Sequence, residues 1–325
     1  MLKAIQTVQP NPKAHVRLEE IPRPSIGQGE LLIKVKAAAI NPSDVRNVQG
    51  VFPQTQFPCI PGRDFAGLVE EGPKDWIGRR VFGSASSLGF IKPGSHAQYL
   101  VISHKTVVPS PDDLTDYQLA ALGVPYTTAW EGLHTKAQVS RGETVLIIGI
   151  TGAVGLAALS IARAQQCRVI GVGRRQEALD ILGLDETVDT SRQNLVEVVK
   201  EMTQEKGVDI IVDTVGGSTF ADHGQCLGQN GRWIVLASVG GPTVSFNVVD
   251  FYHRQAHMLG VDSLAFEPQK SQQILAALVQ TVDHQSLLQP ELHPVPLESA
   301  PEIYQAIAEG KERRKVILCP WGVGN

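Results

Sequence analysis

A run of glycines and small residues at positions 149–155 is the first place where this chain could do chemistry. An apolar segment of strand type, residues 144–148, precedes the run, and a segment of helical character, residues 156–165, follows it. Glycines at such a turn let the backbone approach a pyrophosphate, which the free N–H groups at the helix N-terminus can bind. We therefore predict a dinucleotide site at this turn. The residues expected to contact or pack against the pyrophosphate are Gly152, Ala153, Val154 and Gly155.

The end of the next strand indicates which dinucleotide the turn would hold. Residues 168–172 form a second strand-like run, and Gly173-Arg174-Arg175 follows it. An acidic residue at this place binds the ribose 2′-hydroxyl of NAD, whereas arginine accommodates the 2′-phosphate of NADP. Guanidinium groups suit phosphate because they donate paired hydrogen bonds in one plane. We predict NADP(H) as the cofactor, with these three residues contacting it; the alternative is a solvated basic turn.

The segments around these motifs predict an α/β protein with two domains of different class. The early strand-like runs are residues 31–39, 65–70, 80–83 and 98–103, which favour a compact β domain. From residue 144 onward strands alternate with helices, which predicts a doubly wound parallel sheet. The strands expected there are 144–148, 168–172, 209–213, 233–237 and 257–261, and the helices are 153–165, 195–206 and 219–227.

The end of the chain is expected to rejoin the first domain. Residues 271–282 and 299–309 have helical character, and residues 315–318 read as a final strand with no obvious partner in the parallel sheet. We therefore predict a discontinuous β domain of residues 1–121 and 265–325, with residues 122–264 forming the nucleotide-binding domain.

The bulk composition narrows the class of protein. The chain has 325 residues, of which 42% are hydrophobic and 19% charged, and its formal net charge is −4. This composition is typical of a globular protein with material for about two domains. The mild negative charge offers no attraction to nucleic acid or to an anionic membrane, and no apolar run approaches the ~20 residues of a membrane helix. Four cysteines without paired spacing, and an N-terminus without a signal-peptide pattern, favour a cytoplasmic protein.

Short motifs follow one another along nearly the whole chain. They are Asn-Pro-Ser-Asp at 41–44, Pro-Gly-Arg-Asp-Phe-Ala-Gly at 61–67, Gly-Ser-His-Ala-Gln-Tyr at 94–99, Tyr-Thr-Thr-Ala-Trp at 126–130, the glycine turn, Asp-Thr-Val-Gly-Gly at 213–217, Ala-Ser-Val-Gly at 237–240 and Lys-Val-Ile-Leu at 315–318. In this order they resemble the medium-chain dehydrogenase/reductase superfamily, and within it the zinc-free quinone oxidoreductase branch. The set is far more specific than any single motif.

The resemblance implies a GroES-like β domain and a Rossmann domain, with the active site in the cleft between them and a homodimer or homotetramer joined through the nucleotide domains. By family position, Asn41 and Thr128 are expected beside the nicotinamide and the substrate as catalytic residues. The alternative for Asn41 is an Asn-Pro turn residue that caps its own backbone. The remaining residues implied to contact the cofactor are Ser238, Val239, Gly260 and Val261.

The chain departs from the zinc-dependent members of this superfamily. It has Asn41 where they have a cysteine ligand, Arg63-Asp64 where they have His-Glu, and no four-cysteine lobe. Because zinc needs converging Cys, His or carboxylate ligands, we expect no metal. Without a Lewis acid, the expected reaction is hydride transfer from NADPH to a quinone or an α,β-unsaturated carbonyl, with hydrogen-bond donors stabilising the carbonyl oxygen. The expected substrate is a small, hydrophobic quinone or carbonyl compound.

One position bears on the substrate class and leaves the proton donor open. The segment around Phe52 is similar to 2-enoyl thioester reductases, which carry a proton-donating tyrosine where this chain has phenylalanine. Solvent water, Tyr126 and His96 are alternative donors, and Phe52, His96 and Tyr126 are the expected substrate-pocket residues. Two other functions stay open: a 2-enoyl thioester reductase, and a non-catalytic NADPH-binding protein.

Overall fold

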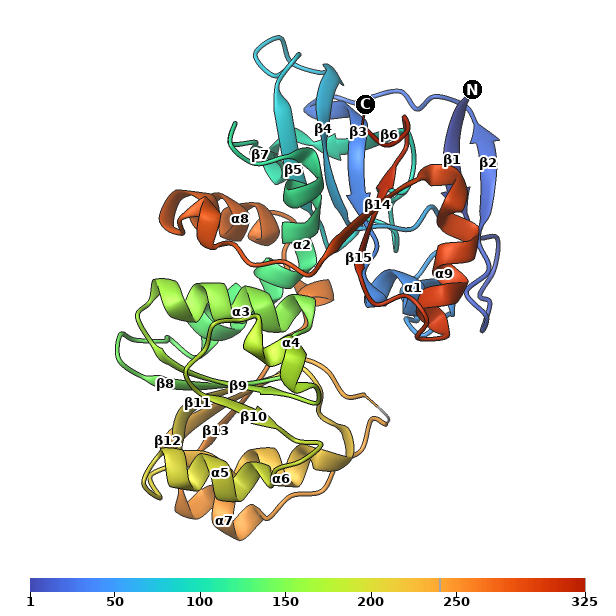
Figure 1. Ribbon diagram of the computed structural model, residues 1–325. Coiled ribbons are helices and arrows are strands. Elements are labelled where there is room, and N and C mark those ends of the chain that lie inside the picture. Colours follow the sequence, from blue (N-terminus) through green and yellow to red (C-terminus); the bar gives the residue numbers. More distant parts are fainter. Residues whose placement is uncertain (240, 325) are drawn as a thin grey trace. The chain divides into compact units, whose positions relative to one another are not determined.

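The computed structural model describes residues 1–239 and 241–324, which divide into two compact units (Figure 1). The first unit comprises Met1–Thr127, Ser263–His284 and Glu291–Asn325, and the second comprises Thr128–Asp262 and Gln285–Pro290. These boundaries differ by a few residues from those expected after residues 121 and 264, and the segment 285–290 was expected in the first unit. The first boundary has no turn to mark it, because it falls inside the helix α2 (Asp116–Trp130).

The first unit is built around β3 (Glu30–Ala39), a long and largely buried strand. This strand pairs antiparallel with β4 (Asp64–Glu71), β6 (Tyr99–Ser103) and β15 (Lys315–Cys319). Apolar side chains of these strands, among them Leu31, Phe65 and Leu318, form the core. The final strand therefore returns to this unit, as the sequence predicts, and its register places Ile317 opposite Ala39.

Shorter elements complete the first unit. Its further strands are β1 (Leu2–Gln6), β2 (Arg17–Ile21), β5 (Arg80–Ser84), β7 (Val108–Pro109) and β14 (Leu292–Pro296). Its further helices are α1 (Pro42–Val48), α8 (Lys270–Thr281) and α9 (Ala300–Ala308). The unit is thus a β domain with peripheral helices, and the class expected from the early strand-like runs is confirmed.

The second unit contains a six-stranded sheet in which every pairing is parallel. Its strands are β8 (Thr144–Ile148), β9 (Arg168–Gly173), β10 (Thr187–Asp189), β11 (Val208–Asp213), β12 (Leu227–Val235) and β13 (His257–Gly260). Its helices are α3 (Ala153–Ala164), α4 (Gln176–Asp180), α5 (Leu195–Met202), α6 (Phe220–Gln225) and α7 (Val248–His253). Figure 1 shows α3 and α4 on one face of the sheet and α5, α6 and α7 on the other. The doubly wound parallel sheet predicted from the sequence is confirmed.

The strand order places the sequence motifs at one edge of this sheet. The order is β10-β9-β8-β11-β12-β13, so the chain moves outward from β8 in one direction and then outward from β11 in the other. In open α/β sheets, ligands bind outside the carboxyl ends of the strands where the order reverses. The glycine turn follows β8 and the motif at 213–217 follows β11, so both motifs lie at the reversal point.

A few elements differ from the sequence prediction for local reasons. The helix α5 ends at Met202 rather than at residue 206, because Gln204 and Glu205 adopt positive φ angles of 50° and 63°. The strand β10 was not expected, since three residues are too few to show an alternating pattern. Among the described residues, no helix is long and apolar enough to cross a lipid bilayer.

Candidate functional site

The turn between β8 and α3 can be formed only by glycine at two of its positions. Gly149 has a φ of +75°, and a Cβ built there would lie 2.4 Å from the Thr214 Oγ1. At Gly155 a Cβ would lie 2.5 Å from the Gly149 carbonyl oxygen and 2.6 Å from the Ile150 Cα. The backbone is therefore packed against the Thr214 side chain at Gly149 and against itself at Gly155, and α3 begins tightly against the end of β8.

The middle of the same turn is open. Gly152 is the N-cap of α3, and a Cβ at this position would meet a single neighbouring atom, the Gly149 carbonyl oxygen at 3.3 Å. The space on the Cβ side of Gly152 is thus nearly open. Ala153 and Val154 form the first turn of this helix, where N–H groups have no partner within the helix. This geometry suits an anionic group.

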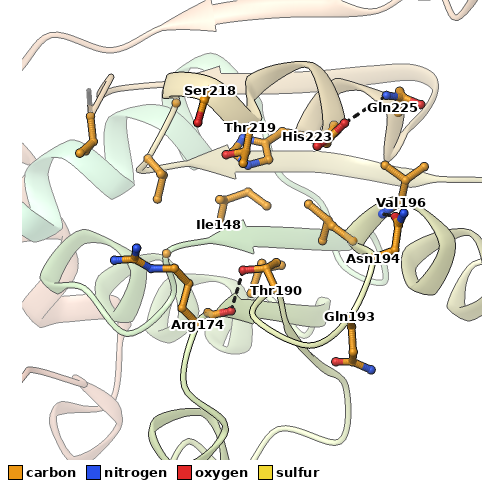
Figure 2. A pocket seen from close by; sticks show the side chains of 18 of the residues that line it. Ile148, Arg174, Thr190, Gln193, Asn194, Val196, Ser218, Thr219, His223 and Gln225 are labelled. Atoms are coloured by element: carbon orange, nitrogen blue, oxygen red, sulfur yellow. Dashed lines mark hydrogen bonds between the residues drawn. The ribbon is translucent and has the colours of Figure 1, made fainter. Parts of the chain in front are cut away.

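A pocket of about 820 Å³ lies at the carboxyl edge of the sheet (Figure 2). The predicted residues among its lining are Gly173, Arg174 and Val239. The lining residues that sequence reasoning missed include Thr190, Asn194, Ser218, Thr219 and His223. Several of these follow the short strand β10 or lie on α6, and their sequence carries no motif that would have indicated a site.

The two adjacent arginines have different positions. Arg174 lines the pocket, whereas Arg175 is the N-cap of α4 and is not among the lining residues. The Thr190 hydroxyl donates to the Gly173 carbonyl oxygen at 3.1 Å, which ties the end of β10 to the end of β9 beside Arg174. The structure therefore distinguishes two residues that the sequence alone treats as equivalent.

The other residues predicted to contact the cofactor lie outside the pocket lining. Ser238 hydrogen-bonds through its hydroxyl to the Gly241 carbonyl oxygen. Gly260 ends β13, and the buried Val261 donates its N–H to the Val235 carbonyl oxygen at 3.0 Å. Gly240, which belongs to the motif at 237–240, is outside the described residues.

A buried carboxylate at the end of β11 accepts several hydrogen bonds from residues of the second unit. Asp213 has no exposed surface, and its Oδ1 accepts the N–H groups of Val215 at 3.0 Å and Gly216 at 2.7 Å. Its Oδ2 lies 2.7 Å from the His223 Nδ1 and accepts the Trp233 indole N–H at 3.3 Å. Burial alone would raise the pKa of Asp213, but these hydrogen bonds and the nearby imidazole hold it below its ordinary value. Asp213 is therefore ionised at neutral pH.

In the first unit, Asn41 belongs to a buried polar cluster. Its amide N–H donates to Asp64 Oδ2 at 2.8 Å, and its Oδ1 accepts from the Lys315 ammonium at 2.5 Å. Its backbone N–H donates to the Asp44 carboxylate at 2.8 Å, which starts α1. Asn41 is thus both the N-cap of α1 and a partner of distant residues, which leaves one amide hydrogen for another acceptor.

This cluster does not fit a zinc ion. The cluster contains an amide, two carboxylates and a lysine ammonium, whereas zinc would need three or four converging Cys, His or carboxylate ligands. Among residues 1–239 and 241–324, no three His, Cys, Asp or Glu side chains are grouped so that they could hold a metal ion. Arg63 is also structural, since its guanidinium donates to the Ser263 hydroxyl at 3.1 Å and to the Ser263 carbonyl oxygen at 2.9 Å.

The remaining predicted residues are placed separately. Both ring nitrogens of His96 are hydrogen-bonded, to the Tyr304 hydroxyl at 2.8 Å and to the Ala39 carbonyl oxygen at 3.2 Å, and burial lowers its pKa to about 4. Phe52 is half-buried, with its ring edge-on to Phe90 at 5.5 Å. Tyr126 is buried on α2 in the first unit, and the buried Thr128 lies on the same helix but in the second unit.

Comparisons with known proteins cover both units. A family model described as zinc-binding dehydrogenase matches residues 153–280, and one described as alcohol dehydrogenase GroES-like domain matches residues 27–112. The quinone oxidoreductase of Homo sapiens is 32% identical over 290 residues, which cover 86% of each chain. A zinc-type alcohol dehydrogenase-like protein of Schizosaccharomyces pombe is 36% identical over 285 residues, covering 86% of this chain and 84% of its own. The crystal structure of an alcohol dehydrogenase superfamily protein from Novosphingobium aromaticivorans is 28% identical, with a TM-score of 0.85 and coverage of 98% and 99%.

Proposed function

The chain belongs to the medium-chain dehydrogenase/reductase superfamily and to its quinone oxidoreductase branch, and on that premise we propose that it uses NADPH to reduce quinones or α,β-unsaturated carbonyls without a metal. The observation that carries the cofactor proposal is the pocket at the reversal point of the sheet, with Arg174 in its lining and Gly173 where an acid would select NAD. The coarser conclusion, an oxidoreductase fold with a dinucleotide site, follows from the family and the fold together.

The residues of the second unit fit a dinucleotide. The pyrophosphate would lie on residues 152–155. There is space beside Gly152, whereas Gly155 is packed against other backbone atoms. Arg174 would contact the 2′-phosphate, and Thr190 would fix the strand end beside it. When bound, the cofactor supplies the hydride. Ser238, Val239, Gly260 and Val261 remain proposed contacts by family position.

The chain's own residues would stabilise the substrate oxygen. The amide of Asn41 keeps one N–H after its bond to Asp64, and its orientation is fixed by the Lys315 ammonium on the other side. A donor held in this way is suited to a carbonyl oxygen on which negative charge develops. Thr128 is proposed as the second catalytic residue. Because both nitrogens of His96 are occupied and its pKa is lowered, Tyr126 or solvent water is the better proton source.

The proposal of metal independence rests on the donor set. The ammonium of Lys315 bonds to the residue that replaces a cysteine ligand, and a second cation, Arg63, is buried beside Asp64. Two buried cations would repel a divalent metal ion. The charge needed to balance Asp44 and Asp64 is thus supplied by side chains.

Oligomeric state and location are part of the same proposal. β13 ends the order of the parallel sheet, and its Met258 is 41% exposed. The neighbouring helix α7 exposes Val248, Val249 and Tyr252. Apolar side chains beside a sheet edge suit a contact between copies, so a homodimer or homotetramer joined through this unit is proposed. We also propose a cytoplasmic protein that binds neither nucleic acid nor membranes, in keeping with its net charge of −4.

An oxidation assay with a small substrate panel tests the function. NADPH consumption would be measured with quinones such as 9,10-phenanthrenequinone, with alkenals, with alcohols and with crotonyl-CoA, each with and without a chelator. Turnover of quinones or alkenals that the chelator leaves unchanged is expected. Faster turnover of crotonyl-CoA would favour a 2-enoyl thioester reductase, and tight NADPH binding without any turnover would favour a non-catalytic protein.

A further inference from the structure

The pocket of the second unit contains a hydrogen-bonding group that neither the glycine turn nor Arg174 explains. His223 lies on α6 among the lining residues, although only 3% of it is exposed. Figure 2 shows its ring beside Thr219, on the opposite side of the pocket from Arg174. A buried imidazole at this place needs a partner for each ring nitrogen.

One nitrogen of His223 has its partner in the protein. Asp213 is ionised and accepts four hydrogen bonds, one of them from the His223 Nδ1 at 2.7 Å. The proton of the neutral ring is therefore on Nδ1, which leaves a lone pair on Nε2. Within residues 1–239 and 241–324, Nε2 makes no hydrogen bond. A ligand in the pocket that brings an N–H group would complete the pair.

The surroundings of His223 favour a flat, uncharged group over an anion. Leu195, Val196 and Val215 contribute apolar surface to the same pocket. Glu197 and Asp222 also line it, and their carboxylates would repel a phosphate on this side. Arg174, the proposed partner of the 2′-phosphate, lies on the opposite side of this pocket. A purine base matches this combination of apolar walls and one hydrogen-bond acceptor.

We propose that His223 selects adenine, because its Nε2 accepts a hydrogen bond from the exocyclic amino group of the base. The inference rests on the proposed function in taking the pocket to be a dinucleotide site. It adds a residue that sets base specificity and a positioning residue, Asp213, that fixes the tautomer. A base with an oxygen in place of the amino group, such as hypoxanthine, would bring two acceptors face to face and leave both unpaired.

The test compares NADPH with deamino-NADPH, in which hypoxanthine replaces adenine. Dissociation constants would be measured by the fluorescence of the bound dinucleotide. For the wild type we expect NADPH to bind roughly 10-fold more tightly than deamino-NADPH. This factor corresponds to the free energy of one hydrogen bond that is made with adenine and left unpaired with hypoxanthine. His223→Phe keeps an aromatic ring but removes both nitrogens, so the ratio should fall to about 1. Arg174→Ala is the matched control: it should weaken both dinucleotides by the same factor and keep the ratio.

A second variant, Asp213→Asn, tests the tautomer directly. The new amide would turn its oxygen to the Val215 and Gly216 N–H groups and its amino group to the His223 Nδ1, which then becomes the acceptor. The Trp233 indole N–H would lose its acceptor in this variant. The proton moves to Nε2, so deamino-NADPH should bind at least as well as NADPH. Circular dichroism would show that each variant is folded. If His223→Phe does not fold, His223→Leu would replace it, with the same loss of preference expected because leucine offers no hydrogen-bond acceptor.

The outcomes separate this inference from the proposed function. Equal binding of the two dinucleotides by the wild type, or a preference for NADPH that survives in His223→Phe, would overturn it. If the adenine preference is found but NADH binds as well as NADPH, or no substrate is reduced, the proposed function fails and the inference stands. If neither dinucleotide binds, both are wrong.

Discussion

The ammonium nitrogen of Lys315 lies 2.5 Å from the Oδ1 of Asn41, and these side chains belong to residues that are 6% and 2% exposed. The same ammonium donates to the Ile40 carbonyl oxygen at 3.2 Å. Burial lowers the pKa of Lys315, and the nearby Asp64 and Asp44 carboxylates oppose that shift. This places a cation from the last strand at the start of α1, where it holds the Asn41 side chain against Asp64.

Removal of this cation should destabilise the protein. Lys315→Met keeps most of the length of the side chain but removes one of the two buried cations that offset the charges of Asp44 and Asp64. We expect a loss of about 3–5 kcal/mol in the free energy of unfolding, the size found when buried charged groups lose a partner, measured by urea denaturation. Lys311→Met is the control, because its ion pair with Glu309 is exposed and should contribute nothing measurable. Equal effects of the two substitutions would contradict a role for the buried cluster.

The stability of the first unit should depend on pH through Asp44. Burial, and then the nearby Asp64 charge, raise the pKa of Asp44 to about 7 from its ordinary 3.8. Between these values the folded protein holds a proton that the unfolded chain has released, so stability falls as the pH rises through this window. In Asp44→Asn this contribution is absent. Urea denaturation between about pH 5 and about pH 8 should show the variant gaining stability relative to the wild type as pH rises; parallel profiles would show that Asp44 stays ionised in the fold.

Much of the fold could be predicted because its signals are local. The strand β8 has the bounds read from the sequence, since a short apolar run that is rich in β-branched residues and ends at a glycine is typical of a buried strand. The strand β10 could not be predicted, because its three residues acquire strand geometry only by pairing with β9. The domain boundary inside α2 likewise depends on which contacts each half of the helix makes.

The residues of the candidate site also divide into those that neighbouring sequence could predict and those that depend on tertiary contacts. Arg174 could be named because its distance from the glycine turn is fixed by one helix and one strand. His223 could not, because its role depends on α6 folding back so that the ring meets Asp213, ten residues earlier. The pairing of Asn41 with Lys315 joins residues 274 positions apart and has no signature in the sequence. Spacing therefore indicated the groups that we propose to contact phosphate, and missed those whose partners are set by tertiary contacts.

Substitution of two glycines of the turn should have different effects on stability and on NADPH binding. In Gly155→Ala the new Cβ would meet backbone atoms at 2.5–2.7 Å, so we expect a loss of about 1–3 kcal/mol in the free energy of unfolding together with loss of NADPH binding. In Gly152→Ala the nearest atom is at 3.3 Å, so the fold should persist while the methyl group hinders the pyrophosphate. Thermal denaturation and NADPH titration of both variants test this. Equal stability losses would mean that Gly152 is also a packing residue.

Phe52 tests the choice between quinone and thioester reduction. Its ring packs edge-on against Phe90, and a hydroxyl added in Phe52→Tyr extends from a half-buried position. A quinone reductase whose proton comes from elsewhere should show little change in either quinone or crotonyl-CoA turnover. A positioned acid contributes roughly 100- to 10,000-fold, so a gain of that order with crotonyl-CoA would favour the 2-enoyl thioester reductase.

The two arginines after β9 provide the sharpest test of the cofactor. Arg174 lines the pocket and Arg175 does not, so Arg174→Ala should remove a charge-assisted contact to the 2′-phosphate worth about 1.5–3 kcal/mol. The Michaelis constant for NADPH should then rise by roughly 10- to 100-fold, whereas that for NADH, which lacks the phosphate, should stay nearly unchanged. Arg175→Ala is the matched control and should affect both cofactors little. If Arg174→Ala weakens NADPH and NADH equally, the arginine contacts a part that the two cofactors share, and the preference for NADPH has no basis at this site.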